Sequence, residues 1–401
     1  MNPRLTLGKD LGRHLATGHP WIWADALAAG GPRPAVGTIV DVHDKAGRFV
    51  ARGPFDPGSP IAVRVWTTDA AAQVDAALVR ARLREALGAR RSAGILADTN
   101  AVRLLHGEGD YCPGLVCDLY ADTAVVRCDG DAARTLAPAL VAALLTEVPA
   151  ILGVPVQRIY ERRTGKAARQ ESGERGAPLH GGQPPRRIEI HEGAARFPVD
   201  VVAGQKTGFF LDQRDNRRLV ARHAAGADVL NCFSYTGGFS VACALAGARR
   251  VTSVDVARPA LDAAREGFRI SGLDPEAHAF VAEDCFEVLR RHAAAGTRHG
   301  VVILDPPSFA PSSKALPAAL AAYTDLGALG LAVVEPGGIL ATASCSSHVT
   351  PEAFLTVLRD AAVRAGRRVR VLDVRGAGPD HPVVPGFPEG RYLKLLLAHV
   401  V

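Results

Sequence analysis

A glycine-containing turn in the C-terminal half has the residue types that bind a nucleoside-like ligand. The sequence Val-Leu-Asn-Cys-Phe-Ser-Tyr-Thr-Gly-Gly-Phe-Ser-Val at 229–241 predicts a strand, a turn and a helix. Glycine lets the backbone approach a ligand closely, and the start of a helix offers free N–H groups. The turn lacks the Gly-x-Gly-x-x-Gly pattern of dinucleotide sites, which disfavours a bound pyrophosphate.

Asp255 and Asp284 each end a predicted strand after this turn. Asp255 follows about twenty residues later, where a carboxylate accepts both hydroxyls of a ribose. Asp284 is expected at the adenine edge of the same crevice, because ligands of such sheets bind outside the carboxyl ends of the strands. The alternatives are a purely structural turn and surface aspartates; the spacing favours the ribose.

Asp305 and Cys345 follow two further predicted strands. Val-Val-Ile-Leu runs into Asp305, and two prolines then stiffen the exit, which suits a turn that grips a planar base. Cys345 stands in Leu-Ala-Thr-Ala-Ser-Cys-Ser-Ser-His, among small polar residues at the next strand end. A buried structural cysteine is the usual alternative. The position favours a nucleophile, provided that the thiol pKa is lowered.

The elements that must position these side chains alternate regularly from about residue 196. Apolar, strand-like runs around Val229, Val251, Val301 and Ile339 are separated by helical stretches. This βαβα order predicts an α/β domain with a parallel, doubly wound sheet. Two last strands are expected at 368–373 and 392–401, joined by a loop rich in Gly and Pro.

Two smaller domains are predicted before it. Residues 1–70 show alternating apolar and polar residues between Asp-Pro-Gly turns, which is typical of a small β-rich domain. Residues 71–195 combine helical and strand-like stretches into a central α+β domain. It contains a basic loop at 162–187. This loop is either a solvated surface loop or a flexible basic arm that binds the phosphate backbone of a nucleic acid. The remaining residues, 196–401, form the doubly wound domain.

The composition indicates an intracellular protein whose positive net charge favours a polyanionic partner. The 401 residues carry a formal net charge of +6 and seven scattered cysteines, so free thiols and a reducing compartment are expected. We find no apolar run long enough to cross a membrane and no signal peptide, which predicts a cytoplasmic protein without a membrane partner. The histidines show no metal-ligand spacing, and no metal site is expected.

Most of the chain resembles one family, the bacterial large-subunit ribosomal RNA methyltransferases of class I. The matching stretches at 204–401 are Gly204-Gln-Lys-Thr-Gly-Phe-Phe-Leu-Asp-Gln-Arg, the Asn231–Phe239 turn, Asp255, Asp284, Asp305-Pro-Pro-Ser-Phe and Ser344-Cys-Ser. Gly18-His-Pro-Trp-Ile-Trp and residues 37–66 resemble the family's N-terminal PUA domain, and residues 107–120 its central domain. The chain is most similar to the branch that makes 5-methylcytosine in 23S rRNA.

The resemblance implies a class I, Rossmann-like methyltransferase sheet at the C-terminus and S-adenosyl-L-methionine as cofactor. It assigns to cofactor binding Lys206, Thr207, Phe210, Asn231, Phe233, Tyr235, Thr236, Gly237, Asp255, Asp284 and Asp305. It assigns contacts with the target base or RNA to Pro306, Pro307, Phe309 and Arg214. The implied partner is 23S rRNA with little or no bound protein; the oligomeric state stays open, a homodimer included.

Carbon 5 of cytosine is a poor nucleophile and must be activated before it can accept a methyl group. A thiolate added at C6 makes C5 nucleophilic, so that C5 accepts the methyl group; this assigns Cys345 as nucleophile and Asp305 as the group that stabilises the base. The target base must leave its stack to reach them. The alternatives are a guanine methyltransferase, which needs no cysteine, a small-molecule methyltransferase, and a non-catalytic RNA-binding protein.

Overall fold

The chain folds into two compact units in a computed structural model that describes residues 2–163 and 176–401. Residues 164–175 of the predicted basic loop lie outside the described residues. The first unit comprises Met1–Ile188, Val199–Leu211 and Pro379–Gly390, and the second comprises Glu189–Pro198, Asp212–Gly378 and Arg391–Val401. The domain boundaries at 70 and 195 stay predictions.

The N-terminal part of the first unit is a small β domain, as its alternating sequence predicts. Two sheets and a short helix enclose an apolar core that includes Leu5, Ile22, Val40 and Val63. The larger sheet has the order β1-β3-β4, and β2 pairs with β5 in the smaller one. The elements are β1 (Arg4–Thr6), α1 (Gly12–Ala16), β2 (Trp21–Trp23), β3 (Ile39–His43), β4 (Phe49–Pro54) and β5 (Ile61–Arg64).

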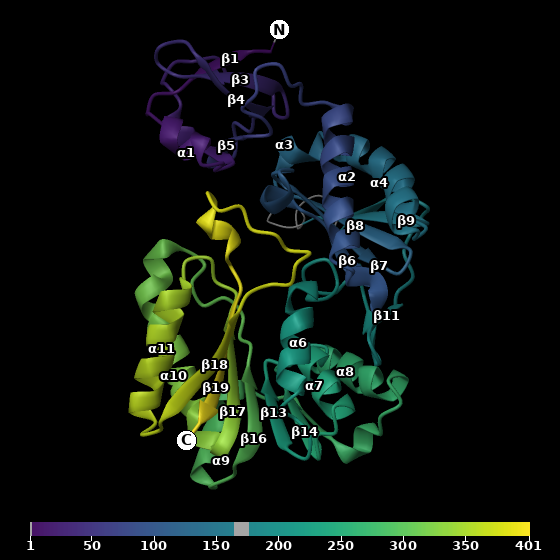
Figure 1. The fold of residues 1–401 in the computed structure, drawn as a ribbon, viewed down its shortest axis with the longest axis vertical. Helices are drawn as coiled ribbons and strands as arrows, with labels where there is room; N and C mark the ends of the chain where they lie inside the picture. Colours follow the sequence, from purple (N-terminus) through teal and green to yellow (C-terminus); the bar gives the residue numbers. More distant parts are fainter. Residues whose placement is uncertain (1, 164–175) are drawn as a thin grey trace. The chain divides into compact units, whose positions relative to one another are not determined.

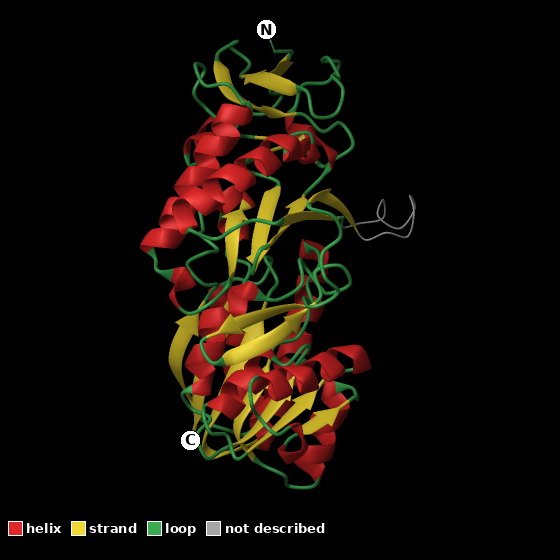
Figure 2. Cartoon of the chain, turned by 90° about the vertical axis from the view of Figure 1, so that its right-hand side faces the viewer, coloured by secondary structure: helices red, strands yellow, loops and turns green. Residues whose placement is uncertain are grey.

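The rest of the first unit is a five-stranded sheet with two long helices packed together on one face (Figure 2). The strand order is β10-β9-β8-β7-β6, and β8 and β9 are its one parallel pair among the described residues. The elements are α2 (Ala76–Ser92), β6 (Ala101–His106), β7 (Leu115–Tyr120), β8 (Thr123–Cys128), α3 (Asp131–Arg134), α4 (Ala137–Leu152), β9 (Arg158–Arg162) and β10 (Gly176–His180). The helical and strand-like stretches expected between residues 71 and 195 thus form.

The second unit is built on a seven-stranded sheet with helices on both faces (Figure 1). The sheet has the order β15-β14-β13-β16-β17-β19-β18, and β19 is antiparallel to both its neighbours. The strands are β13 (Asp228–Cys232), β14 (Arg250–Val254), β15 (Ala279–Val281), β16 (His299–Leu304), β17 (Val334–Ser344), β18 (Val369–Arg375) and β19 (Lys394–Val400). Before them come the hairpin β11 (Ile188–Glu192) and β12 (Ala195–Val199) and the helix α6 (Arg214–Ala221).

Helices on both faces explain the apolar character of the central strands. The helices are α7 (Gly238–Leu245), α8 (Arg258–Ile270), α9 (Cys285–Ala294), α10 (Leu316–Val333) and α11 (Pro351–Arg364). Every residue of β16 is buried, as a strand covered on both faces requires. The chain order reverses at β13, which pairs in parallel with β14 on one side and β16 on the other. The carboxyl ends of these strands form the switch point where ligands of such sheets bind.

One described helix, Ser313–Val333, is long and apolar enough to cross a membrane by length and composition. Half of its apolar window is buried within the unit, and α10 packs on β16, β17 and α11. Buried Tyr323, Leu326 and Leu331 belong to the core of the second unit. We therefore interpret α10 as a core helix.

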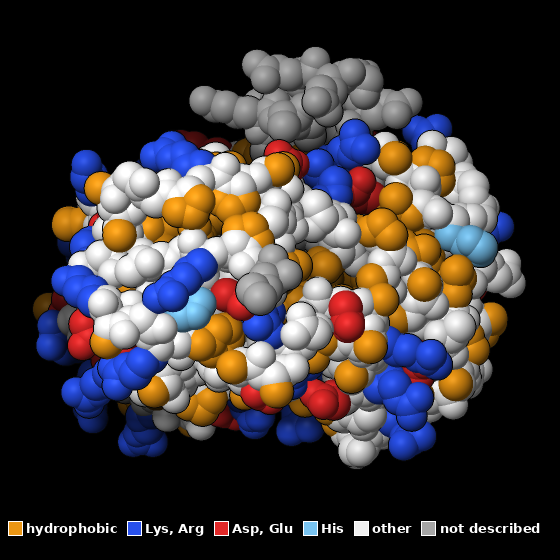
Figure 3. Space-filling view, turned by 90° about the horizontal axis from the view of Figure 1, so that it is seen from above, with side chains coloured by type: hydrophobic (Ala, Val, Ile, Leu, Met, Phe, Trp, Pro, Cys, Tyr) orange, Lys and Arg blue, Asp and Glu red, His pale blue; other side chains and the backbone are white. Residues whose placement is uncertain are grey.

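The charged side chains lie mainly on the surface, in mixed groups. On the face shown in Figure 3, Lys and Arg side chains form several groups, with Asp and Glu among them.

All seven cysteines are free thiols, and Cys345 is the one that is not fully buried.

Candidate active site at the carboxyl ends of the sheet

The turn after β13 has a backbone that few sequences adopt. Phe233 and Tyr235 have φ of 60° and 47°, and Gly237 has φ of 77°. A Cβ atom at Gly237 would lie 2.8 Å from the Cβ atom of Ala264, so only glycine fits between this turn and α8. Such left-handed residues cost free energy and are concentrated at ligand sites. The glycine turn predicted from sequence is therefore a specialised loop at the switch point.

Asp255 is bound to this turn by two backbone hydrogen bonds. Its carboxylate accepts the N–H of Tyr235 at 2.8 Å and that of Ala257 at 2.9 Å. A carboxylate has about four acceptor positions, so these two bonds leave room for a donor on a ligand. Asp255 is half-buried beyond the end of β14, and its contact with a ribose stays a prediction.

Three side-chain oxygens of the turn are buried without a hydrogen-bond partner in the described chain: Asn231 Oδ1, Ser234 Oγ and Thr236 Oγ1. The Asn231 amide instead donates to Ser240 Oγ at 2.9 Å, and Ser253 Oγ donates to the same oxygen at 2.7 Å. Buried polar atoms without partners are rare and unfavourable. The turn thus retains hydrogen-bonding capacity that fits a polar ligand such as a nucleoside.

Asp284 has a structural role that was not predicted for it. It is the N-cap of α9, where its carboxylate accepts the N–H of Glu287 at 3.1 Å, and it is exposed. The following Cys285 links α9 to the glycine turn, because its sulfur accepts the N–H of Phe233 at 3.1 Å. Contact between Asp284 and an adenine stays a prediction.

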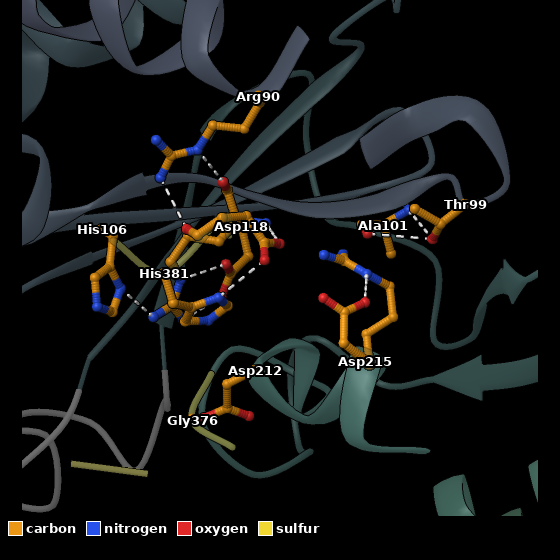
Figure 4. Close-up of polar contacts among 12 residues, drawn as sticks. Arg90, Thr99, Ala101, His106, Asp118, Asp212, Asp215, Gly376 and His381 are labelled. Atoms are coloured by element: carbon orange, nitrogen blue, oxygen red, sulfur yellow. Dashed lines mark hydrogen bonds and ion pairs between the residues drawn. The ribbon is translucent and has the colours of Figure 1, made fainter. Parts of the chain in front are cut away.

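Lys206, Thr207 and Phe210 belong to the first unit, and their cofactor role stays a prediction. The Thr207 hydroxyl donates to the buried carboxylate of Asp118 and lies 2.9 Å from the Tyr120 hydroxyl. The Lys206 ammonium group lies 4.3 Å from the centre of the Phe210 ring. Asp118 is part of a polar cluster of this unit that also includes Arg90, His106 and His381 (Figure 4). The Gly-Gln-Lys-Thr-Gly segment is therefore anchored by buried hydrogen bonds.

Asp305 lies directly beyond β16 and is oriented by a buried amide. Gln213 donates to the Asp305 carboxylate at 2.9 Å. The Gln213 oxygen in turn accepts the Asn216 amide at 2.6 Å, and Asn216 also donates to the carbonyl of Gly376. Gln213 stands in the motif that begins at Gly204, but sequence reasoning gave it no role; its contact with Asp305 depends on the fold.

Cys345 and the Asp-Pro-Pro turn meet at the ends of adjacent strands, as the sequence predicts. The Cys345 sulfur lies 3.9 Å from the carbonyl oxygen of Pro306. The Ser308 hydroxyl donates to Ser346 Oγ at 3.2 Å, and Ser346 Oγ donates to the carbonyl of Ala310. These bonds hold the Ser-Cys-Ser segment against the turn, with Cys345 partly accessible.

The residues predicted to contact the base or RNA differ in exposure. Pro306 is buried, Pro307 is exposed, and Phe309 packs on Tyr323 with ring centres 4.7 Å apart. Arg214 is 2% exposed at the start of α6, with the Asp215 carboxylate at 3.6 Å. An RNA contact by Arg214 stays a prediction, and its burial points to a mainly structural environment in this conformation.

Sequence reasoning missed two residues beside Cys345, Tyr323 and Lys394. Ser344 donates to the Tyr323 hydroxyl at 3.1 Å, and burial raises the pKa of this phenol. Lys394 begins β19 and is 2% exposed, and burial lowers the pKa of its amine to about 8. The only sequence signal was a lysine at the head of the apolar run Lys394–Val400.

Among the described residues, no His, Cys, Asp and Glu side chains gather into a metal site.

Comparisons with known proteins agree with this geometry. A family model described as S-adenosylmethionine-dependent methyltransferase matches residues 166–386, and a PUA-like domain model matches residues 5–68. The ribosomal RNA large subunit methyltransferase I of Klebsiella pneumoniae is 36% identical over 98% of this chain and 97% of its own. The protein of that name from Salmonella newport is 37% identical over 98% and 96%.

Solved structures show the same fold over the whole chain. A proposed S-adenosylmethionine-dependent methyltransferase from Streptococcus mutans aligns with a TM-score of 0.84, 23% identity and full coverage of both chains. Another structure, of a proposed methyltransferase complexed with SAH, aligns with a TM-score of 0.85, also at 23% identity and full coverage. The predicted fold class and cofactor are confirmed. The chain belongs to the S-adenosylmethionine-dependent methyltransferases, within the family of the ribosomal RNA large subunit methyltransferase I proteins.

Proposed function

We propose that this protein methylates carbon 5 of a cytosine in 23S rRNA through a covalent adduct with Cys345. The observation that carries the proposal is the position of Cys345, a partly accessible thiol 3.9 Å from the carbonyl of Pro306 in the Asp-Pro-Pro turn. A nucleophile and a carboxylate at adjacent strand ends are what cytosine C5 chemistry needs. Nitrogen methylation of guanine, the rival reaction, needs no thiol at this place.

Each residue has a defined task in this mechanism. The Cys345 thiolate forms a bond to C6 of the cytosine, and Asp305, held by Gln213, binds the base edge at N3 or the exocyclic amine. S-Adenosylmethionine bound at this site would supply the sulfonium methyl group to C5 and would leave as S-adenosylhomocysteine. A base then removes the C5 proton, the electron pair reforms the C5–C6 double bond, and the bond between C6 and the cysteine sulfur breaks.

The proposed cofactor site is the turn after β13 together with Asp255. We expect Asp255→Ala to weaken binding of S-adenosylmethionine by about 10- to 100-fold, because hydrogen bonds to a charged group are worth about 1.5–3 kcal/mol. The change also removes two bonds that hold the turn at Tyr235 and Ala257. Isothermal titration calorimetry measures the affinity directly.

The matched control is Asp262→Ala, which removes an exposed carboxylate from the neighbouring helix α8. It should leave the affinity for S-adenosylmethionine unchanged. Equal affinities for the wild type and Asp255→Ala, with a folded variant, would remove Asp255 from the site.

The RNA partner is proposed from the chain's charge and its N-terminal domain. A net charge of +6 favours a polyanion, and a PUA-like domain at 5–68 has no evident use for a small-molecule substrate. Because the target base must be unstacked, we propose 23S rRNA with little or no bound protein as substrate. We further propose a cytoplasmic location, and a homodimer as the assembly to test.

Nucleoside analysis tests the proposed reaction. Unmodified 23S rRNA is incubated with the protein and labelled S-adenosylmethionine, digested, and separated by liquid chromatography with mass spectrometry. We expect label in 5-methylcytidine. Label in a methylguanosine would overturn the assignment of the base and the role of Cys345, while leaving the family and cofactor intact.

A further inference from the structure

Lys394 is a buried lysine beside the proposed nucleophile, and no carboxylate in the described part of the chain pairs with it. The Lys394 ammonium group donates to the carbonyl oxygens of Ser346 and Tyr392, the latter at 2.7 Å, and the side chain is 2% exposed. A buried charge is costly unless an opposite charge pairs with it. The two carbonyls are neutral and satisfy hydrogen bonds without neutralising the charge, and no ion pair of Lys394 is present among the described residues.

The fold places this ammonium group next to Cys345. In the antiparallel pair of β17 and β19, Lys394 lies opposite Ser344, and Cys345 is the next residue along the chain. The Lys394 ammonium group also donates to the carbonyl of Ser346, the residue that follows Cys345. Lys394 therefore contacts the residues on both sides of Cys345 in the sequence. A negative charge on the Cys345 sulfur raises the pKa of Lys394 in opposition to burial, so the two groups interact electrostatically.

We propose that Lys394 is a positioning residue whose buried positive charge stabilises the Cys345 thiolate. This inference rests on the nucleophilic role of Cys345 proposed above. When the thiol loses its proton to solvent, the resulting anion supplies the counter-charge that Lys394 lacks. The other titratable groups facing this region are Asp305 beyond β16, whose negative charge opposes the thiolate, and the phenol of Tyr323 on α10. Lys394 is therefore a positive charge that favours ionisation of Cys345.

Alkylation of Cys345 by iodoacetamide, measured as a function of pH, tests whether Lys394 stabilises the thiolate, and it requires no methyl transfer. Mass spectrometry of the peptide that contains Cys345 separates it from the six buried cysteines. We expect Lys394→Gln and Lys394→Met to slow alkylation at pH 7 by about tenfold and to move the pH midpoint upward. Lys394→Arg, which keeps the charge, should stay closer to the wild type.

The glutamine variant separates charge from structure. Its amide keeps N–H donors but carries no charge, so a wild-type alkylation profile in Lys394→Gln would show that the charge is not needed and would overturn the proposal. Lys314→Gln removes an exposed charge from the same unit and should change nothing. Circular dichroism confirms that each variant is folded.

The wild type alone also tests the proposal if the variants fail to fold. A pH midpoint for Cys345 at or above that of cysteines in the denatured chain would overturn it, whereas a lower midpoint supports it. Methylation of 23S rRNA is measured in parallel. A lowered pH midpoint without formation of 5-methylcytidine would support the Lys394 inference and overturn the proposed function. Formation of 5-methylcytidine with an unshifted midpoint would support the proposed function and overturn the Lys394 inference.

Discussion

Replacement of Cys345 by alanine is expected to abolish methyl transfer to rRNA while leaving the cofactor site intact. Loss of a covalent nucleophile reduces turnover by about three orders of magnitude or more. Cys345 follows β17, whereas the proposed cofactor turn follows β13, and Cys345 is not among the residues assigned to the cofactor, so binding of S-adenosylmethionine should change by less than about twofold. Labelled methyl incorporation and calorimetry measure the two quantities.

Cys243→Ala is the matched control for this change. Cys243 is fully buried on α7, and burial raises the pKa of its thiol to about 12, so it cannot serve as a nucleophile near neutral pH. The control should retain wild-type methylation. Full activity of Cys345→Ala would exclude covalent catalysis at this residue and favour the guanine alternative.

Replacement of Arg90 by methionine is expected to destabilise the first unit by about 3–5 kcal/mol, because it leaves a carboxylate buried without its partner. Arg90 is 1% exposed, and its guanidinium donates two bonds to Asp110, at 2.7 and 2.6 Å. It also donates to the carbonyls of Arg103 and Asp380 and thereby connects α2, β6 and the 379–390 segment. Urea unfolding monitored by circular dichroism measures the free energy of unfolding.

Two further variants identify the cause of this loss. Arg91→Met, at the neighbouring exposed position of α2, should alter the free energy of unfolding by less than about 0.5 kcal/mol. Changing both partners, Arg90→Met with Asp110→Leu, should recover part of the loss, because no unpaired charge remains. An Arg90→Met variant as stable as the wild type would show that the pair contributes nothing.

The sequence was sufficient for the features that depend on local patterns. The strands at the switch point, the glycine turn and the proximity of Cys345 to the Asp-Pro-Pro turn followed from apolar runs that end in polar residues. Parallel strands bring their carboxyl ends to one edge, so residues distant in the chain could be placed together. The family resemblance added the cofactor and the reaction class.

The features that the sequence did not reveal depend on long-range register and packing. Lys394 reaches Cys345 only because β19 inserts between β17 and β18 in the antiparallel direction, with Lys394 opposite Ser344. Gln213 reaches Asp305 across 92 residues of chain. The cap formed by Asp284 is different, because Asp-Cys-Phe-Glu at 284–287 is a local helix-start pattern that was not used in the prediction. No local pattern specifies the other two pairings.

A covalent trap tests the central claim, thiolate addition by Cys345, most directly. 23S rRNA transcribed with 5-fluorocytidine carries a fluorine that cannot leave C5 as a proton does, so the bond between C6 and the enzyme cannot break after methyl transfer. The protein is incubated with this RNA and S-adenosylmethionine, resolved under denaturing conditions, digested, and mapped by mass spectrometry. We predict a stable adduct that requires S-adenosylmethionine, maps to Cys345 and is absent from Cys345→Ala. An enzyme that methylates ordinary rRNA yet forms no adduct, or forms it at another residue, would contradict the mechanism.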